Sequence, residues 1–319
     1  MAFAAKILAD SISRIGHRIV TFQLTYPRII HAEALTHREP SRNGASSRAI
    51  PIEKMIAAVE DDPYIPTHWG KNQSGMQAER EMTAEEIELE REKWLEERDY
   101  AVQRARERSE RGLHKQLANR PLETYHWYTA IFTATQWSNF FHLRNNADAH
   151  PEIQRIAQMA EELYKTSSPK LLTEREWHLP LVFPEDWELA KEQGVSGLPQ
   201  TWALLAKVSC ARCARVSYLT HEGKRDLGED IALAGRLLRA GHMSPFEHAA
   251  RPMSGVELEH FRQPAVVGAG ALAPLTFDHN RPTYRLGNLN GWVQYRKTIP
   301  GEEDILAYRA AQQRELIHW

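Results

Sequence analysis

Hydrogen-bond donors are concentrated in residues 36–51, whose sequence is THREPSRNGASSRAIP. The segment contains a single acidic residue, Glu39, although a solvated loop normally mixes acids with its bases. Guanidinium and hydroxyl groups suit oxyanions, because the arginine fork matches a phosphate or carboxylate. The donors are Arg38, Arg42, Arg48, Ser41, Ser46 and Ser47. Their density predicts a pocket for an oxyanion such as phosphate, and a basic surface loop is the alternative.

Two short motifs raise the question of a zinc site. His31-Ala-Glu33 and Cys210-Ala-Arg-Cys213 are similar to the ligand motifs of zinc deaminases that act on nucleotides. However, no proline precedes Cys210, the motifs are far apart in the chain, and we expect His31 between a strand and a loop rather than at a helix start. We therefore predict buried helical cysteines and no metal, with a zinc-dependent deoxycytidylate deaminase as an alternative.

A third group of polar residues lies in the segment GHMSPFEHA, residues 241–249. The spacing of His242, Glu247 and His248 matches no zinc-protease motif. Ser244 fits a helix N-cap and Glu247 fits position N3, so we expect a helix to begin here. A helix start with histidines beside it is suited to the edge of an anion or cofactor site.

The elements that position these groups are predicted from local patterns. Residues 17–30 are rich in β-branched and aromatic side chains, which indicates a strand. Thr83 and Glu86 form a capping-box pattern at the start of a long helix that ends before Gly112. Residues 113–164 are predicted to be mostly helical.

The second half of the chain begins with a change in composition. Prolines and glycines punctuate residues 166–200, which we interpret as a connector outside the core. Two helices are predicted beyond it, the second ending at Gly241. We expect one integrated domain in which residues 1–165 and 201–319 are joined by this connector.

Bulk properties narrow the classes of function. The chain has 319 residues, a net charge of −2 and two cysteines. This charge gives no reason to expect a nucleic acid polymer or an anionic membrane as a partner. No apolar run approaches the ~20 residues of a membrane span, and the first residues are too weakly apolar for a secretory signal. The low cysteine count favours a reducing compartment, so we expect a cytoplasmic protein.

The donor-rich segment resembles the signature of flavin-dependent thymidylate synthases, which is Arg-His-Arg, seven residues, then Ser-x-Arg. His37, Arg38, Ser46 and Arg48 match it, and Thr36 replaces the first arginine. Three further blocks are similar to the same family. They are residues 114–153, ending their helical stretch in Phe-x-x-Leu-Arg; ARVSY at 214–218; and GHMSPFEHA at 241–249.

The order of these blocks differs from that of the family. The blocks at 214–218 and 241–249 precede the Arg-His-Arg block in family members, whereas here they follow it. The chain therefore resembles a circularly permuted member, a rearrangement that is tolerated where chain ends lie close together at the surface. The resemblance implies an α+β fold with a mixed sheet and long helices.

The resemblance also implies a reaction and a set of site residues. Family members transfer a methylene group from methylenetetrahydrofolate to C5 of dUMP, using FAD, and NADPH is a possible reductant. We expect a homotetramer, because the family shares its FAD site between subunits. The implied flavin contacts are His37, Arg38, Asn139, Ser217, His242, Ser244 and Glu247. The implied nucleotide contacts are Glu33, Ser46, Ser47, Arg48, Arg120 and Arg144. Among these, Arg144, His242 and Arg48 are the expected catalytic residues.

Four positions depart from the family pattern: Thr36, Glu33 in place of a glutamine, Gly44, and Thr133 in place of an asparagine. Glu33 bears on the substrate, because an ionised carboxylate accepts hydrogen bonds and cannot donate them. Near the base it would suit the amino group of cytosine better than O4 of uracil. The alternative is that Glu33 pairs with an arginine and does not contact the base.

Several functions therefore remain open. The first is a thymidylate synthase, and the second is a flavin-dependent hydroxymethylase of dUMP or dCMP for DNA base modification, as occurs in phage and other viral DNA. A non-catalytic nucleotide-binding protein is also possible. The C-terminal block GNLNGWVQYRK has no counterpart in the family; Trp292, Gln294 and Arg296 alternate as in a strand. It could cover the site, bind folate or pack as an added strand, and we favour packing.

Overall fold

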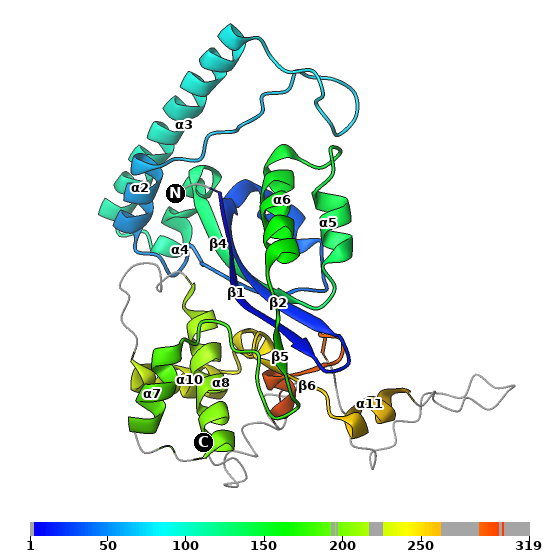
Figure 1. The fold of residues 1–319 in the computed structure, drawn as a ribbon. Coiled ribbons are helices and arrows are strands. Elements are labelled where there is room, and N and C mark those ends of the chain that lie inside the picture. The colour runs from blue at the N-terminus through cyan, green and yellow to red at the C-terminus, as the bar shows by residue number, and fades with distance from the viewer. Residues whose placement is uncertain are drawn as a thin grey trace, which may run out of the picture. The chain divides into compact units, whose positions relative to one another are not determined.

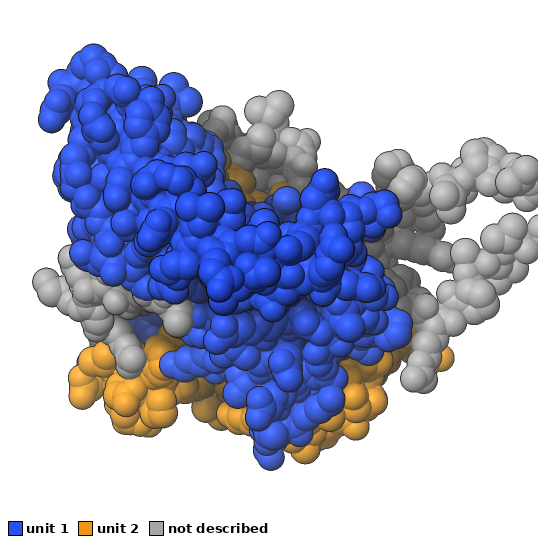
Figure 2. Space-filling model, turned by 90° about the horizontal axis from the view of Figure 1, so that it is seen from above, with its two compact units in different colours: residues 1–8, 20–168, 212–224 blue, residues 9–19, 169–211, 225–319 orange. Residues whose placement is uncertain are grey.

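The structure is a computed structural model that describes residues 3–192, 195, 197–216, 226–262, 287–299 and 302 (Figure 1). The chain divides into two compact units (Figure 2). Unit 1 comprises residues 1–8, 20–168 and 212–224, and unit 2 comprises residues 9–19, 169–211 and 225–319. Each unit therefore combines segments that are far apart in the sequence.

A five-stranded sheet has the strand order β3-β4-β2-β1-β5. The strands are β1 (Ala4–Ser13), β2 (Arg18–Pro27), β3 (Ser41–Gly44), β4 (Trp127–Ala134) and β5 (Lys170–Leu172). In unit 1, β4 pairs antiparallel with both β2 and β3. In unit 2, the end of β1 pairs in parallel with β5. The sheet is mixed, and the prediction of an α+β fold with a mixed sheet and long helices is confirmed.

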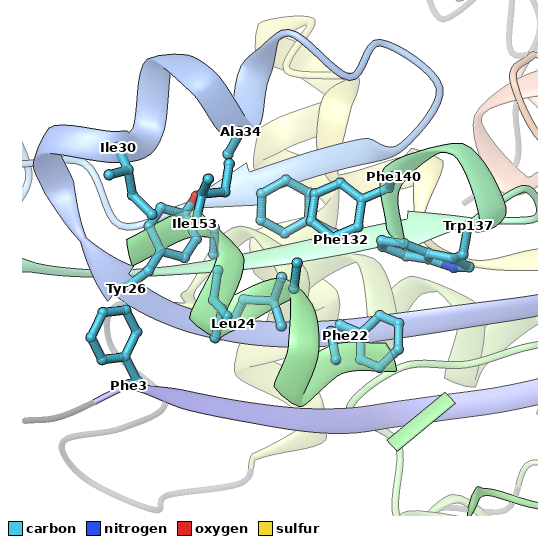
Figure 3. Close-up of a cluster of buried hydrophobic side chains, with 14 of the residues drawn as sticks. Phe3, Phe22, Leu24, Tyr26, Ile30, Ala34, Phe132, Trp137, Phe140 and Ile153 are labelled. Atoms are coloured by element: carbon cyan, nitrogen blue, oxygen red, sulfur yellow. The ribbon is translucent and has the colours of Figure 1, made fainter. Parts of the chain in front are cut away.

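The main core of unit 1 lies between the sheet and helices α5 (Ser138–Arg144) and α6 (Pro151–Thr166). Figure 3 shows Phe22 and Leu24 of β2 and Phe132 of β4 among these buried side chains. The rings of Phe22 and Trp137 meet edge to face, with 4.8 Å between their centroids. This packing fixes α5, which carries Asn139 and Arg144, against the sheet.

A second cluster in unit 1 packs α2 (Ile52–Asp61) against the long helix α3 (Ala84–Glu110). Thr83 caps α3 and forms the predicted capping box with Glu86. Gly112 follows the helix with a φ of 79°, a left-handed conformation that glycine adopts without strain. The prediction of this helix and of both its ends is confirmed.

Unit 2 is mainly helical. Its elements are α7 (Pro184–Glu192), α8 (Leu198–Ala214), α10 (Leu227–Ala240), the 3₁₀ helix η3 (Ser244–Glu247), β6 (Ala250–Pro252), α11 (Gly255–Arg262), β7 (Trp292–Gln294) and the 3₁₀ helix η4 (Tyr295–Thr298). Helices α8 and α10 contribute most of its core. Gly241 ends α10 in a left-handed conformation, as predicted. No helix among the described residues is both long and apolar enough to cross a bilayer.

Two predictions in the first half of the chain need correction. Residues 113–164 are mostly helical, with α4 (Lys115–Ala118), η2 (Arg120–Tyr125), α5 and α6, but the prediction missed strand β4 at Trp127–Ala134. This strand is paired on both edges and buried along nearly its whole length, so it lacks the alternating pattern of a half-exposed strand. His31, expected between a strand and a loop, begins the short helix α1 (His31–Leu35). That helix follows the 3₁₀ helix η1 (Arg28–Ile30) and has no side-chain N-cap, so the local sequence does not indicate where it begins.

Three further predictions in the second half need correction. Residues 166–200 include β5 and α7, and Leu172 and Leu179 within them are core residues rather than parts of an external connector. Ser244 begins only the four-residue η3, whose N-cap is Met243. Arg296 lies in η4 rather than continuing the strand that contains Gln294.

Candidate functional site

The donor-rich segment is anchored in unit 1 by one of its own arginines. Arg42, on the edge strand β3, donates from Nη1 to the carbonyl oxygens of Leu35 and His37, at 2.9 and 2.6 Å. Arg38, Ser46 and Arg48 are exposed, and their side chains have no hydrogen-bond or ion-pair partner among the described residues. The segment therefore has one structural arginine and a set of donors that remain available to a ligand.

Arg144 is the centre of a polar cluster at the end of α5. Its Nε donates to Nε2 of His37 at 2.8 Å, and its Nη2 donates to the hydroxyl of Thr36 at 2.8 Å. Its Nη1 lies 4.0 Å from a carboxylate oxygen of Glu33. Burial, with Arg144 and Arg42 nearby, lowers the pKa of His37, so the imidazole is neutral and accepts the hydrogen bond. Thr36 thus serves in this chain as a hydrogen-bond acceptor for Arg144.

A cavity of about 970 Å³ in unit 1 is lined by Glu33 and Arg144 at one part of its wall. Two indole rings, Trp69 and Trp94, line another part and meet edge to face with 6.1 Å between centroids. The volume is in the range of small-molecule sites. The carboxylates of Glu79, Glu90, Asp148 and Glu152 also line the cavity, so most of its charged groups are acidic. The Glu33–Arg144 pair therefore faces a space of small-molecule size whose wall combines aromatic rings with carboxylates.

A second polar cluster gathers around Glu123 in the 3₁₀ helix η2 (Arg120–Tyr125). Its Oε1 accepts hydrogen bonds from the hydroxyl of Ser47 and from Nη1 of Arg120, the latter at 2.9 Å. Its Oε2 lies 3.7 Å from Nε of Arg28. Asn119 fixes the neighbouring loop by donating to the carbonyl oxygen of Ser47 at 2.8 Å. Two predicted nucleotide contacts, Ser47 and Arg120, are thus brought together.

The sequence reading did not identify Arg28 and Glu123 as site residues. Arg28 lies over the ring of Tyr128, with 4.5 Å from its Cζ to the ring centroid. His31 also contacts Tyr128, at 4.3 Å between ring centroids, and burial followed by Arg28 and Arg42 lowers its pKa to about 4. A polar and aromatic layer therefore surrounds Glu123. The Arg120–Glu123 spacing of three residues was the only signal in the sequence.

Two of the departures from the family pattern have a structural explanation. A Cβ at position 44 would lie 2.0 Å from the hydroxyl oxygen of Tyr128, so only glycine fits beside that ring. The hydroxyl of Thr133 lies 2.7 Å from that of Thr21 within the buried sheet. Both residues serve the packing of β4 in this chain.

The remaining implied flavin contacts are divided between the units. Asn139 is exposed on α5 in unit 1, where its side chain has no hydrogen-bond partner among the described residues. His242 and Ser244 are exposed in unit 2. Glu247 forms an ion pair there with Arg296 of the C-terminal block. Ser217 lies outside the described residues. Within the described part of unit 1, the side chains of Arg38 and Asn139 therefore have donors without a partner.

The C-terminal block packs as an added strand, as favoured from the sequence. Strand β7 pairs antiparallel with β6, and Trp292 is fully buried beside Ile19, Leu172 and Leu289. The carboxamide of Gln294 donates to the side-chain oxygen of Asn288 at 2.6 Å. This segment thus completes the core of unit 2.

The cysteine prediction is confirmed. Cys210 and Cys213 are buried in helix α8 of unit 2. Over the residues that the structure describes, no group of three or more histidine, cysteine, aspartate or glutamate side chains is arranged to hold a metal ion. His31 in unit 1 instead forms a hydrogen bond of 2.9 Å with the hydroxyl of Tyr26.

Comparison with known proteins gives a family and a structural match. No curated protein sequence matches the chain. The structure is similar to the crystal structure of a UMP/dUMP methylase, PolB, from Streptomyces cacaoi bound with 5-Br UMP. The TM-score is 0.43 and the identity 14%, over 51% of this chain and 88% of that chain. The family model described as thymidylate synthase complementing protein matches residues 7–170, slightly more than half of the 319 residues. The chain therefore belongs to the thymidylate synthase complementing protein family, Thy1.

Proposed function

We propose that this protein transfers a one-carbon unit from methylenetetrahydrofolate to C5 of a deoxypyrimidine monophosphate, with dUMP converted to dTMP. The observation that carries the proposal is Arg144, which is held by His37 and Thr36 beside Glu33 on the wall of the 970 Å³ cavity. Family membership supports modification of a pyrimidine nucleotide. A rigid guanidinium there would stabilise charge that develops on a pyrimidine carbonyl.

The roles of the other residues follow from their chemistry. Ser46 and Arg48 have free donors for the nucleotide phosphate, and Arg120 would add a second guanidinium. The cofactor would be FAD, which supplies the reducing equivalents when bound and is itself reduced by NADPH. Arg38, His37 and Asn139 would contact it. The family resemblance adds Ser217, His242, Ser244 and Glu247 to the flavin contacts, and His242 would handle a proton.

The wider setting is also part of the proposal. A homotetramer would allow flavin contacts from more than one copy of the chain, and the cytoplasm would supply the reduced cofactors. The blocks at 214–218 and 241–249 lie outside the family match at 7–170. We propose that they are the permuted N-terminal blocks of the family.

Glu33 favours a second candidate function. Its carboxylate is 4.0 Å from Arg144, too far for a hydrogen bond, and it lines the cavity. Its oxygens are therefore available to accept hydrogen bonds from an exocyclic amino group. This arrangement suits dCMP, and attack of water on the transferred methylene would then yield a hydroxymethyl product, as in modified phage DNA bases.

A single assay separates these functions. Purified protein is incubated with FAD, a reductant and methylenetetrahydrofolate, with dUMP or dCMP, and the products are measured by mass spectrometry. A methyl gain on dUMP supports the first proposal, and a hydroxymethyl gain on dCMP supports the second. Folate-independent loss of ammonia from dCMP, together with bound zinc, would identify a deaminase. Binding without exchange of the C5 hydrogen would identify a non-catalytic protein.

The role of Glu33 is tested by the change Glu33→Gln. If the carboxylate reads the cytosine amino group, the ratio of kcat/KM for dCMP over dUMP falls roughly 10-fold, since a hydrogen bond to a charged group contributes about 1.5 kcal/mol or more. Glu85→Gln, an exposed carboxylate on α3, is the matched control and leaves the ratio unchanged. An unchanged ratio in Glu33→Gln would assign Glu33 to Arg144 alone.

A further inference from the structure

The Glu123 cluster has the composition of an anion site that is already occupied by a carboxylate of the protein. The hydroxyl of Ser47 and the guanidinium of Arg120 both donate to Oε1 of Glu123. Arg28 faces Oε2 at 3.7 Å, without a hydrogen bond of normal length. Arg120 is also a donor that the proposed function assigns to the nucleotide phosphate, and Ser47 is among the nucleotide contacts that the family resemblance implies. The carboxylate of Glu123 and a bound nucleotide phosphate would therefore use the same two donors.

The geometry of η2 explains why Glu123 reaches these donors. Side chains three residues apart are eclipsed in a 3₁₀ helix, so Arg120 and Glu123 point to the same side. Asn119 holds the carbonyl oxygens of Ser47 and Ile50 at 2.8 and 3.0 Å, which keeps the Ser47 hydroxyl at this position. The contact is thus built from two fixed backbone segments rather than from two free loops.

Arg28 supplies an alternative partner for the carboxylate. Its guanidinium is held over the Tyr128 ring, and its backbone nitrogen donates to the carbonyl oxygen of His126 at 2.9 Å. A small rotation of the Glu123 side chain would exchange Ser47 and Arg120 for Arg28. The carboxylate would then keep a cationic partner while two donors become free.

We propose that Glu123 is an internal counter-ion that occupies the phosphate donors Ser47 and Arg120, and that a bound phosphate displaces it to Arg28. This inference rests on the proposed function for the identity of the ligand. Two anions cannot share Arg120 without repulsion, so the displacement weakens nucleotide binding relative to a chain that lacks the carboxylate. A nucleoside without phosphate does not compete with Glu123.

The test compares ligand affinities in the wild type and in Glu123→Gln by calorimetry. The amide keeps the shape of the side chain and removes its charge, so the Kd for dUMP and for inorganic phosphate should fall about 5-fold. The Kd for deoxyuridine should not change. Glu107→Gln, which removes a carboxylate paired with Arg104 at 2.7 Å on α3, is the matched control and should change neither affinity. Weaker or unchanged dUMP and phosphate binding in Glu123→Gln, or an equal change for deoxyuridine, would overturn the proposal.

A double-mutant cycle tests the role of Arg28. Arg28→Gln alone removes the alternative partner and should weaken dUMP binding about 5-fold, whereas in the Glu123→Gln background it should have little effect. Equal effects in both backgrounds would contradict the displacement. If Glu123→Gln fails to fold, Glu123→Ala replaces it, and loss of folding in both variants would assign the residue to the fold alone and overturn the proposal.

Failure of this inference and failure of the proposed function give different results. Tighter phosphate binding in Glu123→Gln without any carbon transfer to dUMP or dCMP would support the counter-ion role of Glu123 and contradict the proposed reaction. Carbon transfer together with an unchanged phosphate affinity in Glu123→Gln would support the proposed reaction and contradict the counter-ion role of Glu123. In the supported case, the variant lowers KM for the nucleotide and leaves kcat unchanged.

Discussion

At the residue scale, Thr36 and Glu33 belong to one arrangement around Arg144. Thr36 accepts a hydrogen bond from Arg144 and donates one to the backbone oxygen of Glu33, at 2.8 and 2.6 Å. His37 accepts a second hydrogen bond from the same guanidinium. The arginine is thereby fixed in one orientation beside Glu33, so the departures at positions 33 and 36 belong to one arrangement rather than to two independent changes.

Gly44 gives a prediction about packing at the same scale. In Gly44→Ala the new methyl group would meet the phenol of Tyr128 at 2.0 Å, so we expect a loss of about 1–3 kcal/mol in the free energy of unfolding. Urea denaturation of the purified variant measures it. In a Tyr128→Val background the additional cost of Gly44→Ala should be much smaller, because the atoms that clash are gone.

The control for this prediction is Gly255→Ala. Nothing lies within 4 Å of a Cβ at Gly255, so this change should be nearly neutral. A neutral Gly44→Ala would show that the Tyr128 ring moves freely, and the explanation offered for the glycine would then be wrong.

The sequence predicted some site residues and could not predict others, for a physical reason. Arg144 and His37 belong to recognisable motifs, and the structure brings them into contact although 107 positions separate them. Glu123 carries no motif, and it joins the candidate site because η2 places it beside Ser47, 76 positions away. Contacts of this kind depend on the register of β3 and β4, which local patterns do not encode.

At the scale of elements, a helix was predicted correctly where the sequence carries a capping motif at its ends. Helix α3 begins at a capping box and ends before a glycine, and both signals act over a few residues. Strand β4 failed because its sequence, WYTAIFTA, is apolar on both faces, and such a run does not distinguish a central strand from a buried helix. The tertiary pairing with β2 and β3 decides its conformation.

Two buried histidines in unit 2 lead to a prediction on pH. His178 and His248 are buried in unit 2, and burial lowers the pKa of each to about 3; for His178, neighbouring His248 adds to the effect. In the unfolded chain each imidazole takes up a proton near pH 6.5. As the pH falls from 6.5 toward 3, unit 2 should therefore lose up to about 1.4 kcal/mol per pH unit for each histidine.

Urea unfolding at pH 7.5 and 5.0, followed by tryptophan fluorescence, checks this dependence. In His178→Asn the amide can replace Nδ1, which lies 2.9 Å from the hydroxyl of Ser11, so the fall in stability between these pH values should become smaller. His142→Gln, an exposed histidine on α5, is the control. If His178→Asn and the wild type show the same pH dependence, protonation of His178 does not lower the free energy of unfolding and the prediction is wrong.

At the scale of the whole molecule, the two units are built from interleaved chain segments. Unit 2 takes residues 9–19 from the N-terminal part of the chain, and unit 1 takes residues 212–224 from the C-terminal part. Helical wheels and strand patterns could not reveal this, because it depends on which strand β5 selects as its partner.

The interleaving predicts how the chain behaves when it is cut between Ser168 and Pro169. A fragment of residues 169–319 lacks the β1 residues that pair with β5, and it lacks Ile19 of the core around Trp292. An unpaired strand and an open core cost more than a small domain can supply, so this fragment should not fold alone. Co-expression with residues 1–168 should restore a soluble complex that unfolds cooperatively, measured by co-purification and circular dichroism. If the 169–319 fragment folds by itself with a sharp thermal transition, residues 9–19 are dispensable for unit 2, and the halves are independent domains rather than parts of one interleaved fold.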